Sequence, residues 1–99
     1  MKYEKGDKVY VRAWQEMQED ERVLRDHKGN LYEKDKPGNS FVKSMRRYCG
    51  SAAEIDEVTE DGGFRLVFGD YEKPGYIFRE WAIEPGEKSV TVYIVEKGD

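Results

Sequence analysis

The sequence contains one cysteine, one histidine and three prolines, and it has no long hydrophobic run. A single cysteine excludes a disulfide within the chain and is typical of proteins kept in a reducing compartment. No apolar stretch approaches the roughly 20 residues that a membrane-spanning helix requires. The first residues, MKYEKGDK, also lack the apolar segment of a secretory signal peptide. We therefore expect a cytoplasmic protein that does not engage a membrane.

Reactive side chains are correspondingly scarce. His27 lies in a Lys-Gly-Asn turn and is interpreted as a solvated residue, because it lacks the partners of a general base. Cys49 lies at the C-terminal end of a predicted helix, a position that disfavours a thiolate, and it is interpreted as a small apolar residue. A His27–Cys49 pair is the one nucleophilic alternative. One histidine and one cysteine do not complete a zinc site. The sequence thus predicts no catalytic residue, no metal site and no cofactor.

The composition of the chain is rich in charged and aromatic residues. Charged residues make up 38% of the 99 residues, and aromatic residues make up 13%. This length holds one domain with a modest core, which large rings fill efficiently. The formal net charge of −4 argues against a general binder of the nucleic-acid backbone, which needs a basic surface. We expect a single domain over residues 1–99.

Alternating apolar residues predict several short strands. They occur in residues 8–13 and 64–68 and from Ala53 onward, and the turn at 60–63 joins the last two strands. Residues 79–83 predict a 3₁₀ turn and a short closing strand. Together these elements predict a mainly β fold with short helices. The fold expected is a small SH3-like barrel whose core comprises residues 6–14 and 50–85.

Residues 15–49 are expected to form a helical insertion after the first barrel strand. Trp14, Met17 and Leu24 suggest an amphipathic helix over 14–24. A small hairpin of Val23–Arg25 with Leu31–Glu33 is predicted around the turn at 27–30.

The second half of the insertion is predicted as a loop followed by a helix. Residues 34–39, KDKPGN, read as the loop. The helix carries one buried stripe and ends at Gly50. Asn39 or Ser40 is expected to cap its beginning. The stripe consists of Phe41, Met45 and Tyr48.

An extra strand is predicted over residues 89–96. Both of its faces are apolar or β-branched, so it needs cover on both sides. It is expected either to pair with the first barrel strand or to pair with another chain. The second arrangement would make a homodimer through an exposed edge.

Three segments of the chain carry a family resemblance. They read GDKVYVRAWQEM, FVKSMRRYCG, and FRLVFGDY followed by YIFREWAIEP, with most of the weight on Trp14, Met17, Met45, Tyr48, Cys49 and Gly50. Over roughly residues 6–85, the chain resembles small phage- and prophage-encoded proteins of Gram-positive bacteria, mostly of undefined role. The barrel part is also similar to mind-bomb-type SH3-like repeats, in which a Gly-Asp-x-Val strand and a Trp-containing closing turn recur. The resemblance implies an SH3-like fold and a mobile-element origin, and no catalytic residues.

Interaction surfaces are the remaining functional candidates. The chain has more aromatic residues than one small core buries fully, and clustered exposed rings form interaction patches. The candidate protein-binding aromatics are Tyr32, Tyr71, Tyr76 and Tyr93. Acidic residues of one hairpin could imitate phosphates in a partner's basic groove, and these are Glu54, Asp56, Glu57, Glu60 and Asp61.

We therefore expect a non-catalytic protein-binding module without a cofactor. In the phage setting it would inhibit or regulate a host protein in the host cytoplasm. One form is anti-CRISPR or other anti-defence action on a nucleic-acid-binding defence protein. The alternative is a small nucleic-acid-binding β-barrel, which the net charge opposes. Its candidate contacts, beside rings that stack bases, are Arg12, Lys43, Arg46 and Arg47.

Overall fold

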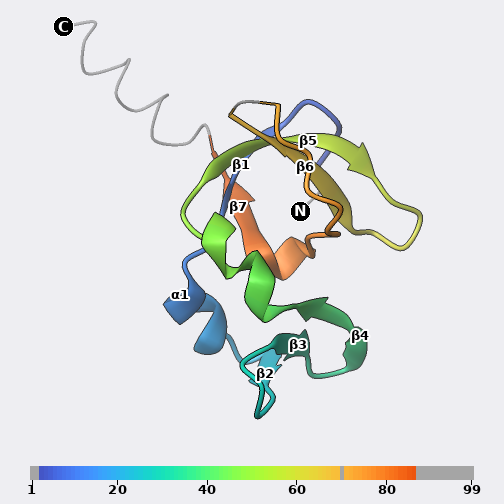
Figure 1. Ribbon diagram of the computed structural model, residues 1–99. Coiled ribbons are helices and arrows are strands. Elements are labelled where there is room, and N and C mark those ends of the chain that lie inside the picture. The colour runs from blue at the N-terminus through green and yellow to red at the C-terminus, as the bar shows by residue number, and fades with distance from the viewer. Residues whose placement is uncertain (1–2, 70, 87–99) are drawn as a thin grey trace, which may run out of the picture.

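Two antiparallel sheets organise the computed structural model, which describes residues 3–69 and 71–86 (Figure 1). The first is four-stranded, in the order β6-β5-β1-β7. Its strands are β1 (Lys8–Val11), β5 (Ala52–Val58), β6 (Phe64–Phe68) and β7 (Ile83–Pro85). β5 and β6 form the predicted hairpin, and a 3₁₀ turn, η2 (Glu80–Ala82), precedes β7 as predicted. The expectation of a mainly β fold with short helices is confirmed.

The second sheet is built by the segment between β1 and β5. It is three-stranded, in the order β2-β3-β4. Its strands are β2 (Val23–Arg25), β3 (Leu31–Glu33) and β4 (Lys36–Phe41). The helix α1 (Trp14–Gln18) precedes this sheet, and a 3₁₀ helix, η1 (Lys43–Tyr48), follows it. In Figure 1 this sheet lies at the end of the molecule away from β5 and β6, with η1 between the two sheets.

The described strands do not close into a barrel. β6 and β7 lie at opposite edges of the four-stranded sheet, and the other three described strands form a sheet of their own. The expected closed barrel is therefore not found. The 15–49 insertion is also less helical than expected, because most of its middle part is strand.

The predicted helix over 14–24 is wrong beyond Gln18. The side chain of Asp20 explains the early end, because its Oδ1 accepts the backbone N–H of Arg22 at 2.8 Å. An acidic side chain that bonds to nearby backbone in this way competes with helix continuation. Leu24 consequently lies in β2 and is 39% exposed, whereas Trp14 and Met17 are buried. The predicted hairpin of β2 and β3 is confirmed.

The predicted loop over 34–39 is also wrong in part, because β4 begins at Lys36. Within the described residues β4 has a hydrogen-bonded neighbour on one side only, namely β3. An edge strand tolerates a proline, here Pro37, because the missing N–H does not interrupt a ladder between two strands.

The helix predicted over 41–48 is shorter and of the 3₁₀ type, and Phe41 ends β4 instead. Neither Asn39 nor Ser40 caps it. The backbone N–H of Lys43 instead donates to Oδ1 of Asn30 at 2.7 Å, across 13 positions of the chain. The predicted buried stripe is confirmed, since Phe41, Met45 and Tyr48 are all buried.

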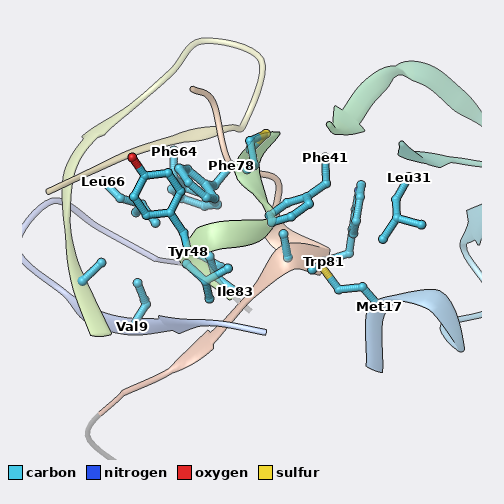
Figure 2. Packing of buried hydrophobic residues seen from close by; sticks show 14 of the residues in the cluster. Val9, Met17, Leu31, Phe41, Tyr48, Phe64, Leu66, Phe78, Trp81 and Ile83 are labelled. Carbon is cyan, nitrogen blue, oxygen red and sulfur yellow. The ribbon is translucent and has the colours of Figure 1, made fainter. Parts of the chain in front are cut away.

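One hydrophobic core joins the two sheets (Figure 2). Phe78, which is fully buried, lies 6.1 Å from Phe41 and 6.2 Å from Tyr48 between ring centroids. Val9 and Ile83 extend the cluster into the four-stranded sheet, whereas its other end is formed by residues outside that sheet, namely Met17, Leu31 and Trp81. This continuity fixes the position of the three-stranded sheet relative to the rest of the fold.

Replacing Gly63 with alanine is expected to lower the free energy of unfolding by about 1–2 kcal/mol, as overpacking does. A β-carbon at Gly63 would collide with Cγ2 of Ile77, which belongs to a β-branched side chain with little freedom to move away. Urea denaturation measures the loss. Gly69→Ala is the control, because a β-carbon there meets nothing within 4 Å. Equal effects of the two substitutions would contradict this account.

Two expectations lie outside the described residues: the extra strand over 89–96, with its dimer contact, and Tyr93. Among the described helices, none has both the length and the apolar character needed to cross a membrane.

Candidate functional site

The turn between β2 and β3 is held by one aspartate. Oδ1 of Asp26 accepts the backbone N–H groups of Lys28 and Asn30, each at 2.9 Å. The side-chain amide of Asn30 donates to Oδ2 of Asp26 at 3.2 Å. These hydrogen bonds, led by that from the Asn30 backbone, hold the pKa of Asp26 below its usual range. The turn therefore has a fixed shape, and Asp26 is the anion that fixes it.

A cleft lies between this turn and η1. Lys43 is anchored to Asn30 through its backbone N–H, and its Cδ would be 3.8 Å from a β-carbon at Gly29. The guanidinium carbon of Arg46 lies 4.8 Å from the ring centre of Trp14. The cleft has a volume of about 310 Å³. We call it the basic cleft, because its lining includes Arg25, His27, Lys28, Lys43 and Arg46 around Trp14.

The arginines of the basic cleft differ from the others in the chain. Five of the seven arginines lie within 4.0 Å of a carboxylate oxygen, namely Arg12, Arg22, Arg47, Arg65 and Arg79. Arg25 and Arg46 have no such ion pair among residues 3–69 and 71–86, and both line the cleft. Both arginines without a carboxylate partner therefore lie at this place.

Two of the four predicted nucleic-acid contacts meet there. Lys43 and Arg46 line the basic cleft. Arg12 does not, and its Nη1 donates to Asp20 at 3.1 Å and to the carbonyl oxygen of Trp81 at 2.7 Å. Arg47 pairs with Glu72 instead. The sequence analysis missed Arg25 and Lys28 as candidate contacts, because it considered the hairpin that carries them only as a structural element.

A second concave surface lies on the three-stranded sheet. It has a volume of about 450 Å³ and is called the sheet groove here. Its apolar lining comes from Leu31, Tyr32, Pro37 and Val42. Its polar groups come from Asn30, Ser40 and Asp26, and Asp26 also lines the basic cleft. Leu31 is fully buried, so one wall of the groove belongs to the core.

The structure does not gather the predicted tyrosines on one face. Tyr32, half-buried in β3, lines the sheet groove. Tyr71 is 86% exposed, and its backbone φ of 62° is unusual for a residue other than glycine. Tyr76 is half-buried, with its hydroxyl 2.7 Å from Oγ of Ser44. Of the tyrosines that the structure describes, Tyr32 and Tyr71 thus mark two separate surfaces.

The predicted acidic residues lie on the hairpin of β5 and β6, and cations offset most of them. Glu57 pairs with Arg65 and Asp61 with Arg79, each at 3.1 Å. Hydrogen bonds from Thr59 and Arg79 hold the pKa of Asp61 well below its usual range. Two further pairs are Glu54–Lys8 at 3.0 Å and Asp56–Lys73 at 3.8 Å. Glu60 is the one member without an ion pair among the described residues. The hairpin therefore presents less net negative charge than its sequence suggests.

The two nucleophile candidates have different surroundings. His27 lines the basic cleft, whereas Cys49 is half-exposed and packs against the core. Burial raises the pKa of the Cys49 thiol, which disfavours the reactive thiolate. In the part of the chain that the structure describes, no group of three or more His, Cys, Asp or Glu side chains is arranged to hold a metal ion.

No family model, curated protein or solved structure matches this chain. The resemblance to phage-encoded proteins therefore stays a prediction. Function is inferred from the sheet groove, the basic cleft and the pairing of charges.

Proposed function

We propose that this chain is a non-catalytic protein-binding module whose contact surface is the sheet groove. In the setting that the resemblance implies, it inhibits or regulates a host protein. The observation that carries the proposal is the open groove of about 450 Å³ beside the edge strand β4. Concave surfaces lined by apolar side chains with a few polar groups are the usual receptors for a partner's anchoring residue.

The occupant that fits this groove is an extended segment of the partner. β4 has one neighbour within the described strands, so backbone groups from Gly38 to Phe41 can pair with an added strand. Pro37 lacks an N–H and limits pairing to that half of β4. An apolar side chain of the segment would then fill the space between Tyr32 and Val42. The rigid core beneath Leu31 reduces the cost of ordering the groove on binding.

The finer fold assignment belongs to the same proposal. We infer an open variant of the SH3-like fold, in which the strand after a tryptophan-containing turn pairs with the first strand. The pairing of β7 with β1, and Trp81 in η2 before β7, support this. The three-stranded sheet is then an elaboration that carries the binding surface.

Phosphate mimicry receives less support than the sheet groove. An anti-defence inhibitor of that kind would dock its acidic hairpin on the basic groove of a nucleic-acid-binding protein. Four of the five acidic side chains already have cationic partners within 4.0 Å. Such exposed pairs contribute little stability, but they reduce the field that a partner experiences.

The Tyr32→Ser variant is expected to reduce partner binding by at least about tenfold, because it removes one apolar wall of the sheet groove. Partners are captured from a host lysate with the wild-type chain and identified by mass spectrometry, and the affinity of each purified partner is measured. Tyr71→Ser is the matched control, because Tyr71 is an exposed tyrosine away from the groove. Circular dichroism confirms that both variants are folded.

Capture should persist at high salt, because apolar contact is screened less than charge pairing. Three outcomes contradict the proposal: no partner at any salt concentration, loss of binding in Tyr71→Ser alone, or equal loss in both variants.

A further inference from the structure

We propose that the basic cleft binds a compact polyphosphate group, such as the di- or triphosphate of a nucleotide or an inorganic polyphosphate. The cleft is next to the sheet groove and shares Asp26 with it, but this inference does not depend on a protein partner in that groove. It rests on three observations: which residues line the cleft, which contacts hold those residues in place, and the contrast between the positive charge of the cleft and the net negative charge of the chain.

The charges in the cleft match a ligand with several negative charges. Four permanently cationic side chains line it, namely Arg25, Lys28, Lys43 and Arg46. Asp26 is the single carboxylate among the lining residues, and its oxygens already accept the hydrogen bonds that fix the turn. The cleft therefore has an excess of about three positive charges. A single carboxylate would leave most of them unbalanced, whereas each phosphate of a chain carries one or two negative charges near neutral pH.

The ion pairing of the chain supports a ligand at this place. A protein of net charge −4 has carboxylates in excess, and its other five arginines lie beside them. Arg25 and Arg46 have no ion pair within the described residues, although the planar guanidinium is well suited to bidentate recognition of phosphate oxygens. The two arginines without carboxylate partners thus converge on one cleft with two lysines.

The cleft is shaped by contacts of the protein itself. Trp14 supports the guanidinium of Arg46 at 4.8 Å from its ring centre. A cation–π contact uses no hydrogen-bond acceptor, so the N–H groups of the guanidinium can still donate to an anion. On the opposite side, the Asp26–Asn30 network fixes the turn that carries Lys28, and Asn30 ties that turn to Lys43. A site held in this way loses little conformational freedom when a ligand binds.

The same charges favour a compact ligand over a long nucleic acid. Beyond the cleft, the surface carries paired charges and an acidic excess, which repel an extended polyanion. A ligand that fits within about 310 Å³ experiences mainly the local cations, because charges further away than about 8 Å are screened at physiological salt. We therefore assign the cleft to a short chain of phosphates.

Isothermal titration calorimetry of the full chain tests the assignment, with tripolyphosphate, ATP and adenosine as ligands at low ionic strength. Tripolyphosphate and ATP are expected to bind, adenosine is not, and binding is expected to weaken as salt is added. Lys28→Gln and Arg46→Gln should each weaken binding about five- to tenfold, as the loss of one charge-assisted contact does. Lys34→Gln is the matched control, because it removes the same charge from an exposed residue outside the cleft.

The titration can give several results, and each of them either supports or overturns the proposal. Equal affinity for ATP and tripolyphosphate supports recognition of the phosphates alone, and tighter binding of ATP supports a nucleotide. Absence of binding by both, or an equal loss in Lys34→Gln and Lys28→Gln, overturns the proposal. Tighter binding of a short single-stranded oligonucleotide than of tripolyphosphate also overturns it, in favour of nucleic acid. The side chain of Lys28 makes no hydrogen bond or ion pair among the described residues, so the Lys28→Gln variant keeps the test valid if Arg46→Gln proves unstable. Tyr32→Ser should bind tripolyphosphate normally, so the outcome is separate from that for the sheet groove.

Discussion

Replacing Phe78 with alanine is expected to lower the free energy of unfolding by about 3–5 kcal/mol. Phe78 is fully buried, and its ring meets those of Phe41, Tyr48 and Phe68 at centroid distances of 6.0–6.2 Å. The substitution removes apolar burial and leaves a cavity where the two sheets share one core (Figure 2). A domain of this size has a total stability of about 5–15 kcal/mol, so a large fraction would be lost.

Urea denaturation followed by tryptophan fluorescence measures this loss. Tyr71→Ala is the matched control, because it removes an aromatic ring that is 86% exposed. Its effect is expected to stay within about 0.5 kcal/mol, as for most surface substitutions. A Phe78→Ala variant no less stable than Tyr71→Ala would show that the two sheets do not depend on this junction.

Replacing Asp20 with alanine is expected to lower the free energy of unfolding by about 2–3 kcal/mol at neutral pH. The carboxylate accepts hydrogen bonds from Arg12 at 3.1 Å and from the side chain of Arg22 at 2.9 and 3.1 Å. Arg12 in turn donates to the carbonyl oxygen of Trp81 at 2.7 Å, so the network links the end of α1 to η2. Without Asp20, the half-buried guanidinium of Arg12 loses its closest carboxylate partner.

The effect of Asp20→Ala should depend on pH in a defined direction. Hydrogen bonds from the Arg22 side chain hold the pKa of Asp20 well below its usual range in the folded state. The unfolded chain binds this proton near pH 4, so the stabilisation by Asp20 is complete above that pH. It declines as the pH falls from about 4 towards the folded-state pKa. The difference between wild type and variant should therefore be largest at neutral pH and shrink in acid.

Denaturation curves collected from pH 7 down to pH 2 measure this dependence. Glu19→Ala provides the comparison, because Glu19 is exposed and accepts one hydrogen bond, from Gln15. A difference between wild type and Asp20→Ala that stayed constant over this range would refute the proposed role of the charge.

The sequence predicted the four-stranded sheet better than the three-stranded sheet, and the reason is the range of the contacts. The hairpin of β5 and β6 follows from alternating apolar residues beside a glycine-containing turn, which is local information. The length of α1 depends on Asp20, and the beginning of η1 depends on Asn30, which lies 13 positions upstream. Neither dependence is visible in a periodic pattern.

The predictions about binding surfaces show the same contrast between local sequence and contacts that are distant in the chain. The sequence named Lys43 and Arg46 among four candidate basic contacts, together with Arg12 and Arg47. It did not place Lys43 and Arg46 beside Arg25 and Lys28, because that arrangement depends on contacts between residues far apart in the chain, such as the hydrogen bond from Lys43 to Asn30. Similarly, Tyr32 was a candidate by residue type, but its groove requires Pro37 to lie in a strand rather than in a loop.

The participation of Leu31 in both the core and the sheet groove has a thermodynamic consequence. A ligand seated on that wall recognises only the native chain, because unfolding disperses the wall together with the core. Linkage then requires occupancy to raise the melting temperature, by the equivalent of about 2.7 kcal/mol when the free ligand is at 100 times its dissociation constant. A thermal-shift screen can therefore rank peptides for this groove before any biological partner has been isolated.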